Sequence, residues 1–186
     1  MAGACVFNNI TDRFIDAKME RTKKRALVTG AVSVQQALLY GTLLLLLGFV
    51  LLAQTNFVTV LIGAVGVLDY VVLYAWAKRA GSYGTLVGTI SGSTPPLAGF
   101  TAATGTITHA SIILFFMMAF WQMAHFYAIA IYRLKDYRAA HIPVLPAVRS
   151  IAATRQQILV YIVLFALSSA YMAYFDYAPW WYALIL

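Results

Sequence analysis

The chain has 186 residues, of which 62% are hydrophobic and only 10% are charged. A water-soluble domain of this length cannot bury so much apolar surface, whereas a helical membrane protein can expose it to lipid. The net charge of +7 would indicate nucleic acid only if the basic residues formed one face, and here they fall between apolar stretches. The composition therefore predicts an all-α, polytopic transmembrane bundle that contacts the lipid bilayer and no nucleic acid.

Three side chains with oxygen atoms, Asn8, Asp12 and Asp16, lie at successive i+4 steps near the start of the chain. On a helix they rise along one face, with a drift of about 40° per step. A dense basic group follows at once: Arg21, Lys23, Lys24 and Arg25. Acids and cations in this arrangement can form plain ion pairs, for example with Arg13 or Arg21. They can equally bind a diphosphate chelated by Mg²⁺, with carboxylates on the metal and Arg or Lys on the phosphate oxygens.

Five apolar stretches are long enough to span a membrane and should be helices, because hydrocarbon offers no water to open backbone groups. They cover residues 34–53, 57–77, 84–103, 110–132 and 157–175. Asp69 interrupts the second stretch, and a carboxyl group is costly there unless it is paired, protonated or faces a cavity. Its role is left open. The third stretch is rich in Gly, Ser and Thr and contains Pro95 and Pro96.

The basic residues predict the orientation of these helices. All 13 lie in three segments, 13–25, 78–79 and 133–155, while the connections 54–56, 105–109 and 176–179 contain none. This alternation satisfies the positive-inside rule for five helices. We therefore expect the segment with Asp12 and Asp16, the turn at Lys78 and the loop at Lys135 and Asp136 on the cytoplasmic side, where they can converge on one site.

Four motifs follow one another along the chain. They are Asn8-Asn9-x-x-Asp12-x-x-x-Asp16-x-x-Met19-x-Arg21-Thr22-x-x-Arg25, Ser91-Gly92-Ser93-x-Pro95-Pro96-x-x-Gly99, Trp121-Gln122-Met123-x-His125-x-Tyr127-Ala128 and Lys135-Asp136-Tyr137-x-x-Ala140-x-Ile142-Pro143-x-Leu145-Pro146. In this order they resemble the motifs of the protohaem IX farnesyltransferase (haem O synthase) family, within the UbiA-type intramembrane prenyltransferase superfamily. The resemblance covers essentially the whole chain, and its first and last motifs are specific to the haem-modifying branch.

The resemblance implies a single transmembrane prenyltransferase domain over residues 1–186, taken from a nine-helix fold of which this chain holds five complete helices. Residues 1–7 are apolar but too short to span, and 178–186 stop after nine residues. The chain is therefore expected to be an internal fragment, truncated at both ends. A bacterial inner membrane is the expected location, ahead of the mitochondrial inner membrane.

The implied reaction transfers a farnesyl group from farnesyl diphosphate to a vinyl group of protohaem IX (haem B) and yields haem O. Mg²⁺ would be the cofactor and haem a substrate, with haem A synthase or terminal oxidase assembly as partners. Ionisation of the allylic diphosphate is the difficult step. Cations and Mg²⁺ at its oxygens stabilise the negative charge that develops in the transition state.

With the resemblance, individual residues receive roles. Metal ligands are expected from Asn8, Asp12 and Asp16 at a first ion and from Asp136 at a second. Diphosphate contacts are expected from Asn8, Arg21, Arg25, Lys135, Arg133 and Lys78. Any one of these cations can instead be a topogenic charge or contact anionic lipid. His125 joins the three aspartates in the catalytic set, where it could ligate haem iron, contact a propionate or move a proton.

Departures from the pattern leave alternatives. Ala140 lies four residues after Asp136, where the superfamily usually has another acid, so the second metal would depend on one protein carboxylate and water. The first alternative is a prenyltransferase that acts on an aromatic acid or a quinone precursor. The loop from Ile142 to Pro146 argues against it, because this loop resembles that of the haem-modifying branch. The second, from another class, is a small membrane transporter, which should carry charges at mid-membrane and repeat symmetry. Here only Asp69 is central.

Overall fold

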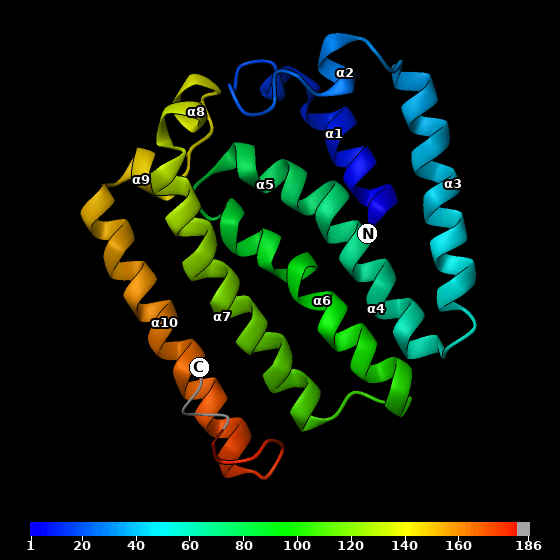
Figure 1. The fold of residues 1–186 in the computed structure, drawn as a ribbon, viewed down its shortest axis with the longest axis vertical. Helices are drawn as coiled ribbons and strands as arrows, with labels where there is room; N and C mark the ends of the chain where they lie inside the picture. Colours follow the sequence, from blue (N-terminus) through cyan, green and yellow to red (C-terminus); the bar gives the residue numbers. More distant parts are fainter. Residues whose placement is uncertain (182–186) are drawn as a thin grey trace.

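The computed structural model describes residues 1–181, and within them the secondary structure is entirely helical (Figure 1). Four helices there are long and apolar enough to cross a membrane by length and composition: α3 (Val34–Leu52), the continuous helix Phe57–Ala80, α7 (His109–Tyr132) and α10 (Ile151–Tyr174). A fifth long helix, α6 (Gly84–Thr104), lies among them. The predicted all-α polytopic bundle is confirmed. The end of the last short stretch, 182–186, lies outside the described residues.

The observed helices match the bounds of the five predicted spans closely, but α6 is not among the four helices that are apolar enough to span a membrane, and the last helix starts earlier than predicted. The last helix begins at Ile151 rather than at residue 157, because Ser150 Oγ accepts a hydrogen bond from the Ala153 N–H at 3.0 Å and caps a polar first turn. The apolar pattern of the sequence therefore located the membrane part of this helix and missed its polar start.

α6 is more polar than its neighbours because its side chains meet other helices. It packs between α4 (Phe57–Leu68) and α7. Its buried polar residues are Thr89, Ser91, Ser93, Thr94 and Thr101. Pro95 has no N–H to donate to the Ser91 carbonyl, and Thr94 Oγ1 donates to that oxygen instead at 2.7 Å. The polar side chains thus satisfy the backbone of a proline-interrupted helix inside the bundle.

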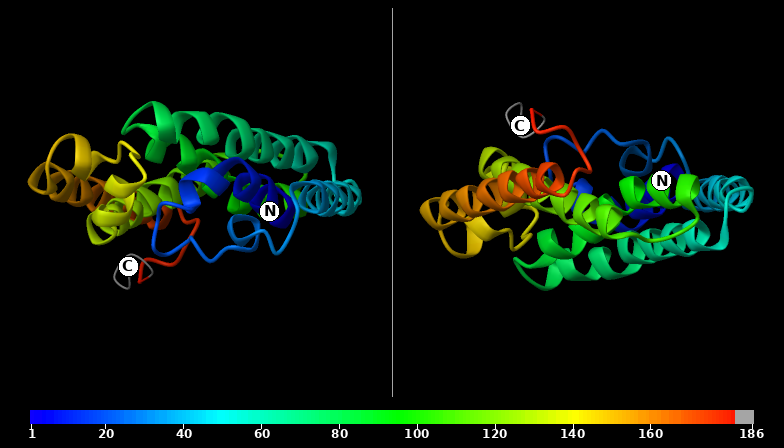
Figure 2. Two further views of the ribbon diagram at one scale, coloured as in Figure 1. Left: turned by 90° about the horizontal axis from the view of Figure 1, so that it is seen from above. Right: turned by 90° about the horizontal axis from the view of Figure 1, so that it is seen from below.

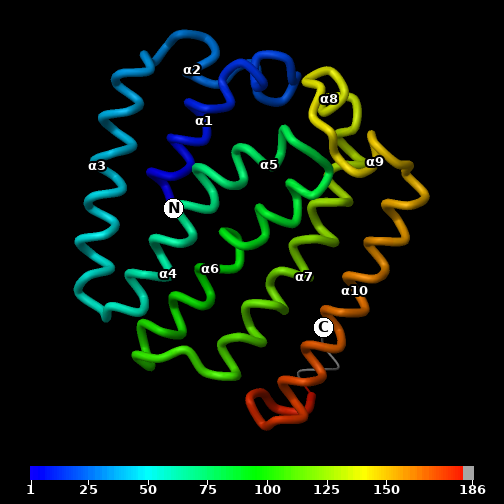
Figure 3. The backbone as a smooth tube through the Cα atoms, turned by 180° about the vertical axis from the view of Figure 1, so that it is seen from behind, coloured from blue at the N-terminus to red at the C-terminus, as the bar shows by residue number. Residues whose placement is uncertain are grey.

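The long helices run up and down in chain order, and from Phe57–Ala80 to α10 each packs against the next, whereas α3 meets the helix Phe57–Ala80 mainly near their connection (Figures 1 and 3). Seen from above and below, they form a flattened assembly (Figure 2). α1 (Ala2–Asp16) packs on α3 and also contacts the helix Phe57–Ala80. The short helices α2 (Ala26–Thr29), α8 (Leu134–Ala139) and α9 (Leu145–Val148) lie in connections.

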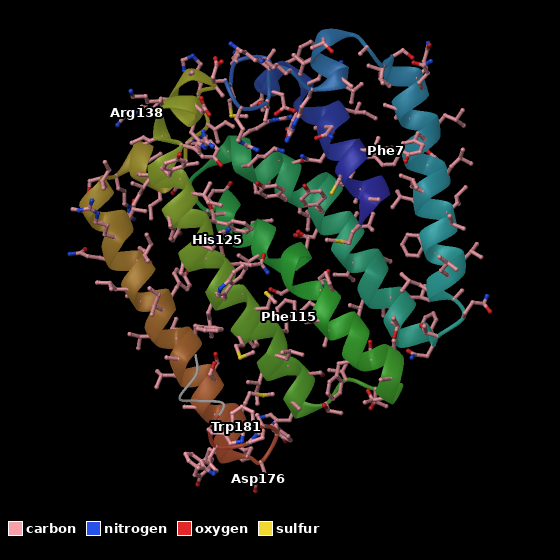
Figure 4. The ribbon with its side chains drawn as sticks, in the orientation of Figure 1. Phe7, Phe115, His125, Arg138, Asp176 and Trp181 are labelled. Atoms are coloured by element: carbon pink, nitrogen blue, oxygen red, sulfur yellow. The ribbon has the colours of Figure 1, made fainter. Side chains whose placement is uncertain are left out.

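Three basic segments meet at one end of this assembly, which we call the basic end. It contains the C-terminal end of α1, the turn between α5 (Tyr74–Ala80) and α6, and α8 (Figure 1). Figure 4 shows Arg138 at this end and Asp176 and Trp181 at the opposite end. The predicted alternation of basic and non-basic connections therefore corresponds to two ends of one bundle.

The helix from Phe57 to Ala80 contains a π-helical turn, η1 (Asp69–Leu73), between α4 and α5. Asp69 begins this turn and is 1% exposed. Its Oδ2 accepts a hydrogen bond from the Ser91 N–H of α6 at 2.9 Å, whereas its buried Oδ1 has no hydrogen-bond partner among residues 1–181. The carboxyl group in the middle of the predicted span thus links the π turn to α6.

Candidate active site

A cavity of about 620 Å³ lies at the basic end, a volume usual for a small-molecule site. Its ionic and amide lining consists of Asn8, Asp12, Asp16, Arg21, Arg25, Lys78 and Arg133. Its largely apolar lining includes Tyr70, Tyr74, Phe126, Ile129, Ile142, Pro143 and Val144. One cavity therefore joins a cluster of charges to an apolar wall, which suits a ligand with an anionic head and an apolar tail.

The α1 face carries the acids of this cavity. Asn8, Asp12 and Asp16 all belong to α1 and all line the cavity, as their i+4 spacing predicts. α1 ends at Asp16, where Thr22 Oγ1 donates to the Asp16 carbonyl at 2.9 Å and folds the next turn back on the helix. That turn brings Arg25 Nη1 to within 2.6 Å of Asp16 Oδ2.

The partners of Asp12 come from α5. Lys78 Nζ donates to Asp12 Oδ2 and also to Asn8 Oδ1, the latter at 2.9 Å, and Arg79 Nη2 lies 3.1 Å from Asp12 Oδ1. Among the described residues, the ion pairs of Asp12 are therefore with α5 and not with the neighbouring Arg13. Buried charges of opposite sign compensate one another for the loss of water.

A ladder of aromatic rings places Lys78. Tyr70, Tyr74 and Lys78 follow at i+4 steps, with the tyrosine rings stacked 5.7 Å apart and Lys78 Nζ 5.0 Å from the Tyr74 ring centroid. α6 approaches the ladder through two glycines. A Cβ atom at Gly84 would lie 2.5 Å from Lys78 Cα, and one at Gly88 would lie 2.8 Å from the Tyr74 ring. Sequence reasoning missed both tyrosines, although their regular spacing from Lys78 was a usable signal.

The loop after α7 meets the turn after α1. Asp136 Oδ1 accepts a hydrogen bond from the Glu20 N–H at 3.3 Å, so two segments 116 residues apart are in contact. Arg133 lines the cavity, whereas Lys135 and Asp136 do not. Tyr137 also lines it, and burial raises the pKa of its phenol, so the hydroxyl keeps its proton at neutral pH and can donate a hydrogen bond.

His125 lies apart from the ionic cluster. Figure 4 shows it partway along α7, between the basic end and the end with Asp176. Its exposed ring stacks on Trp121, with centroids 5.0 Å apart and planes 8° from parallel. The cavity lining includes the next residue, Phe126, but not His125. The structure thus places His125 near the apolar wall and away from the α1 face.

The donor set of the α1 face fits a magnesium ion that brings other ligands with it. Within the described residues there is no group of three or more His, Cys, Asp or Glu side chains that could hold a metal. Two carboxylates and one amide oxygen are too few for an all-protein cage. Mg²⁺ is usually bound by one or two carboxylates together with phosphate oxygens and water, and this set provides that number.

Residues 1–186, the whole chain, match the model of the UbiA prenyltransferase family. The chain is 45% identical over 187 residues to protoheme IX farnesyltransferase of Klebsiella pneumoniae subsp. pneumoniae, covering 100% of the chain and 63% of that protein. It is 48% identical over 184 residues to protoheme IX farnesyltransferase 2 of Chromobacterium violaceum, covering 98% and 61%. With protoheme IX farnesyltransferase 2 of Shewanella loihica it shares 51% over 171 residues, covering 91% and 56%.

The chain therefore spans between 56% and 63% of the length of these curated relatives. No solved structure matches it.

Proposed function

Because the chain belongs to the UbiA prenyltransferase family, we propose that it forms the diphosphate-binding part of an active site that farnesylates protohaem IX. The farnesyl group would pass from farnesyl diphosphate to a vinyl group of haem B, which yields haem O. The names of the relatives support this choice of substrates. The observation that carries the proposal is the meeting of the α1 acids with cations from three other segments in one largely apolar cavity.

The charges in the cavity favour a polyanionic head group. Four cations, Arg21, Arg25, Lys78 and Arg133, line it together with two carboxylates, Asp12 and Asp16, which leaves an excess of two positive charges. The planar guanidinium groups of the arginines can bind phosphate oxygens in pairs, whereas Lys78 acts as a point charge. Of the proposed diphosphate ligands, Lys135 is exposed and outside the cavity lining, so its contact requires a ligand that reaches the loop.

The first chemical step is cleavage of the allylic carbon–oxygen bond, with the electron pair leaving on the diphosphate. Arg25 and Lys78 stabilise the growing negative charge, which is larger in the transition state than in the ground state. When bound, Mg²⁺ supplies positive charge to the same oxygens. Asn8, Asp12 and Asp16 would hold it, and Asp136 would hold a second ion with the help of water.

The second step joins the farnesyl cation to haem. The vinyl π electrons form the new carbon–carbon bond, and water adds to the resulting cation on the porphyrin side with loss of a proton, which gives the hydroxyethyl-farnesyl product. Tyr74, Phe126 and Ile129 line the cavity and would shield the isoprenoid cation from premature attack by water. His125, beside the apolar wall, is proposed to act on haem by ligating its iron, contacting a propionate or moving a proton.

The integral membrane setting gives the site its orientation. All basic connections lie at the basic end, so we propose that this end faces the cytoplasm of a bacterial cell and that the enzyme lies in the inner membrane. Haem A synthase or a terminal oxidase assembly would then receive the product. A transporter is disfavoured, since the ion pairs of Asp12 and Asp16 lie at one end and Asp69 is the one Asp, Glu, Lys or Arg residue in the middle of the described helices.

The test is mass spectrometry of the haems extracted from membranes that contain the protein. A hydroxyethyl-farnesyl adduct of haem B should appear with the wild-type protein and be absent with Asp12→Asn. Prenylated aromatic or quinone precursors in place of the haem adduct would contradict the acceptor. Absence of every prenylated product would contradict the proposed activity.

A further inference from the structure

Both carboxylates of the α1 face are already bound by cations of the chain itself. The side chain of Asp16 is 3% exposed and pairs with Arg25. The side chain of Asp12 is 10% exposed and pairs with both Lys78 and Arg79. Two of the metal ligands named under the proposed function, Asp12 and Asp16, are therefore already paired before any metal ion binds.

A metal ion alone would have to displace these partners at a high cost. Lys78 is 9% exposed, and without Asp12 its ammonium group would be left buried with only an amide oxygen as partner. A diphosphate alone could bind Lys78 and Arg25 only by drawing them away from Asp12 and Asp16. If both arrive together, the carboxylates can bind the metal while Lys78 and Arg25, which line the cavity, turn to the phosphate oxygens. The exchange leaves no buried charge unpaired.

Arg79 cannot take part in that exchange in the same way. It is absent from the cavity lining, its side chain is 43% exposed, and the same Nη2 that approaches Asp12 also donates to the Thr11 carbonyl at 2.9 Å. It therefore holds Asp12 from outside the cavity. Its positive charge competes with a metal ion for Asp12, but it has no route to the diphosphate.

We propose that Arg79 is a further functional residue of this site, an internal cation that lowers the affinity of Asp12 for a metal ion, so that the metal binds well only together with a diphosphate that Lys78 and Arg25 contact. The site then excludes free divalent cations and takes up only the complex. The inference rests on the proposed function, because it assumes that the α1 face binds a metal–diphosphate complex. It adds the condition that neither component binds well alone.

The test measures binding, with Mn²⁺ as the probe and its electron paramagnetic resonance signal as the readout, on the full protein purified in detergent. Wild-type protein should bind Mn²⁺ weakly alone and more tightly once inorganic pyrophosphate is added, at matched concentrations of free Mn²⁺. Arg79→Met should bind Mn²⁺ alone about tenfold more tightly than wild type. Lys78→Met should also bind Mn²⁺ alone more tightly than wild type, but its affinity for pyrophosphate should fall.

Lys18→Met is the matched control, because Lys18 is exposed and makes no ion pair among residues 1–181. It removes one charge from the same end and should leave Mn²⁺ affinity unchanged. Arg79→Gln, which can still donate to Thr11, serves if the methionine variant does not fold. If the Arg79 variants bind Mn²⁺ alone with the affinity of wild type, and wild type still binds pyrophosphate together with Mn²⁺, the inference is overturned. If wild type does not bind pyrophosphate even in the presence of Mn²⁺, the proposed function is overturned instead.

Discussion

At the scale of single residues, the acids of α1 have two roles that the geometry keeps together. Asp12 and Asp16 are buried and salt-bridged, and they also line the cavity with Asn8. The ion-pair and binding-site interpretations of the sequence are therefore not exclusive. The same carboxylates can hold cations of the chain in one state and a metal ion in another.

Neutralising either acid should abolish catalysis without preventing membrane insertion. In Asp12→Asn or Asp16→Asn, we expect the proposed farnesyl transfer to haem to fall by about a hundredfold or more, because the proposed metal binding and charge stabilisation would be lost together. The rate is measured in membranes and normalised to the amount of inserted protein. Asp176→Asn is the control, since Asp176 is exposed at the opposite end and asparagine tolerates its positive φ of 56°. Wild-type rates in either α1 variant would remove the metal role.

At the scale of helices, the packing of α6 against the preceding helix positions Lys78. The π turn η1 begins at Asp69, which binds the backbone of α6, and two glycines of α6 let the tyrosine–lysine ladder approach closely. The sequence of an apolar stretch does not reveal a π turn, because a turn with one extra residue has the same apolar composition as an α-helical turn. The contact between Asp69 and α6 depends on how the two helices pack and not on the local sequence.

The Asp69 contact should stabilise the bundle through its acceptor oxygen. Asp69→Leu leaves the buried Ser91 N–H without this acceptor, which should cost about 1–3 kcal/mol of unfolding free energy. Asp69→Asn keeps an oxygen for Ser91 and should remain close to wild type. Thermal unfolding of the detergent-purified protein gives the comparison. A leucine variant as stable as the asparagine variant would show that the contact contributes nothing.

A methyl group at Gly84 should displace Lys78 and weaken diphosphate binding. The added Cβ would meet backbone atoms of Lys78 at 2.5 and 2.7 Å, and a backbone cannot move aside as a flexible side chain can. We expect Gly84→Ala to raise the KM for the proposed substrate, farnesyl diphosphate, about tenfold. Gly99→Ala in the same helix is the control, because a Cβ atom there meets nothing within 4 Å. Equal KM values in the two variants would contradict the positioning of Lys78 by this close packing.

At the scale of the whole molecule, the decisive feature is that segments far apart in the chain meet at one end. The turn after α1 contacts the loop of Asp136, and the last turn of α5 supplies Lys78. An arrangement with these segments at opposite ends would have left no cavity for a diphosphate.

The basic end should face the cytoplasm. In a Cys5→Ser background, which removes the single cysteine, Arg138→Cys should react with a membrane-impermeant maleimide only in inverted vesicles. Thr106→Cys, exposed in the connection between α6 and α7 at the other end, should react only in right-side-out vesicles. The reverse pattern would place the proposed site on the outer side of the membrane.

The sequence by itself determined the class of protein, the approximate extent of five long helices and the gathering of basic residues at one end. It also placed Asn8, Asp12 and Asp16 on one helical face. These features follow from composition and from periodicities within single helices, which neighbouring residues set locally. Only the tertiary structure decided that Lys78 and Arg79 bind Asp12, that the tyrosines join the cavity, and that Lys135, Asp136 and His125 lie outside its lining. Such contacts depend on the register and rotation of helices packed from distant parts of the chain, and no local pattern of residues encodes them.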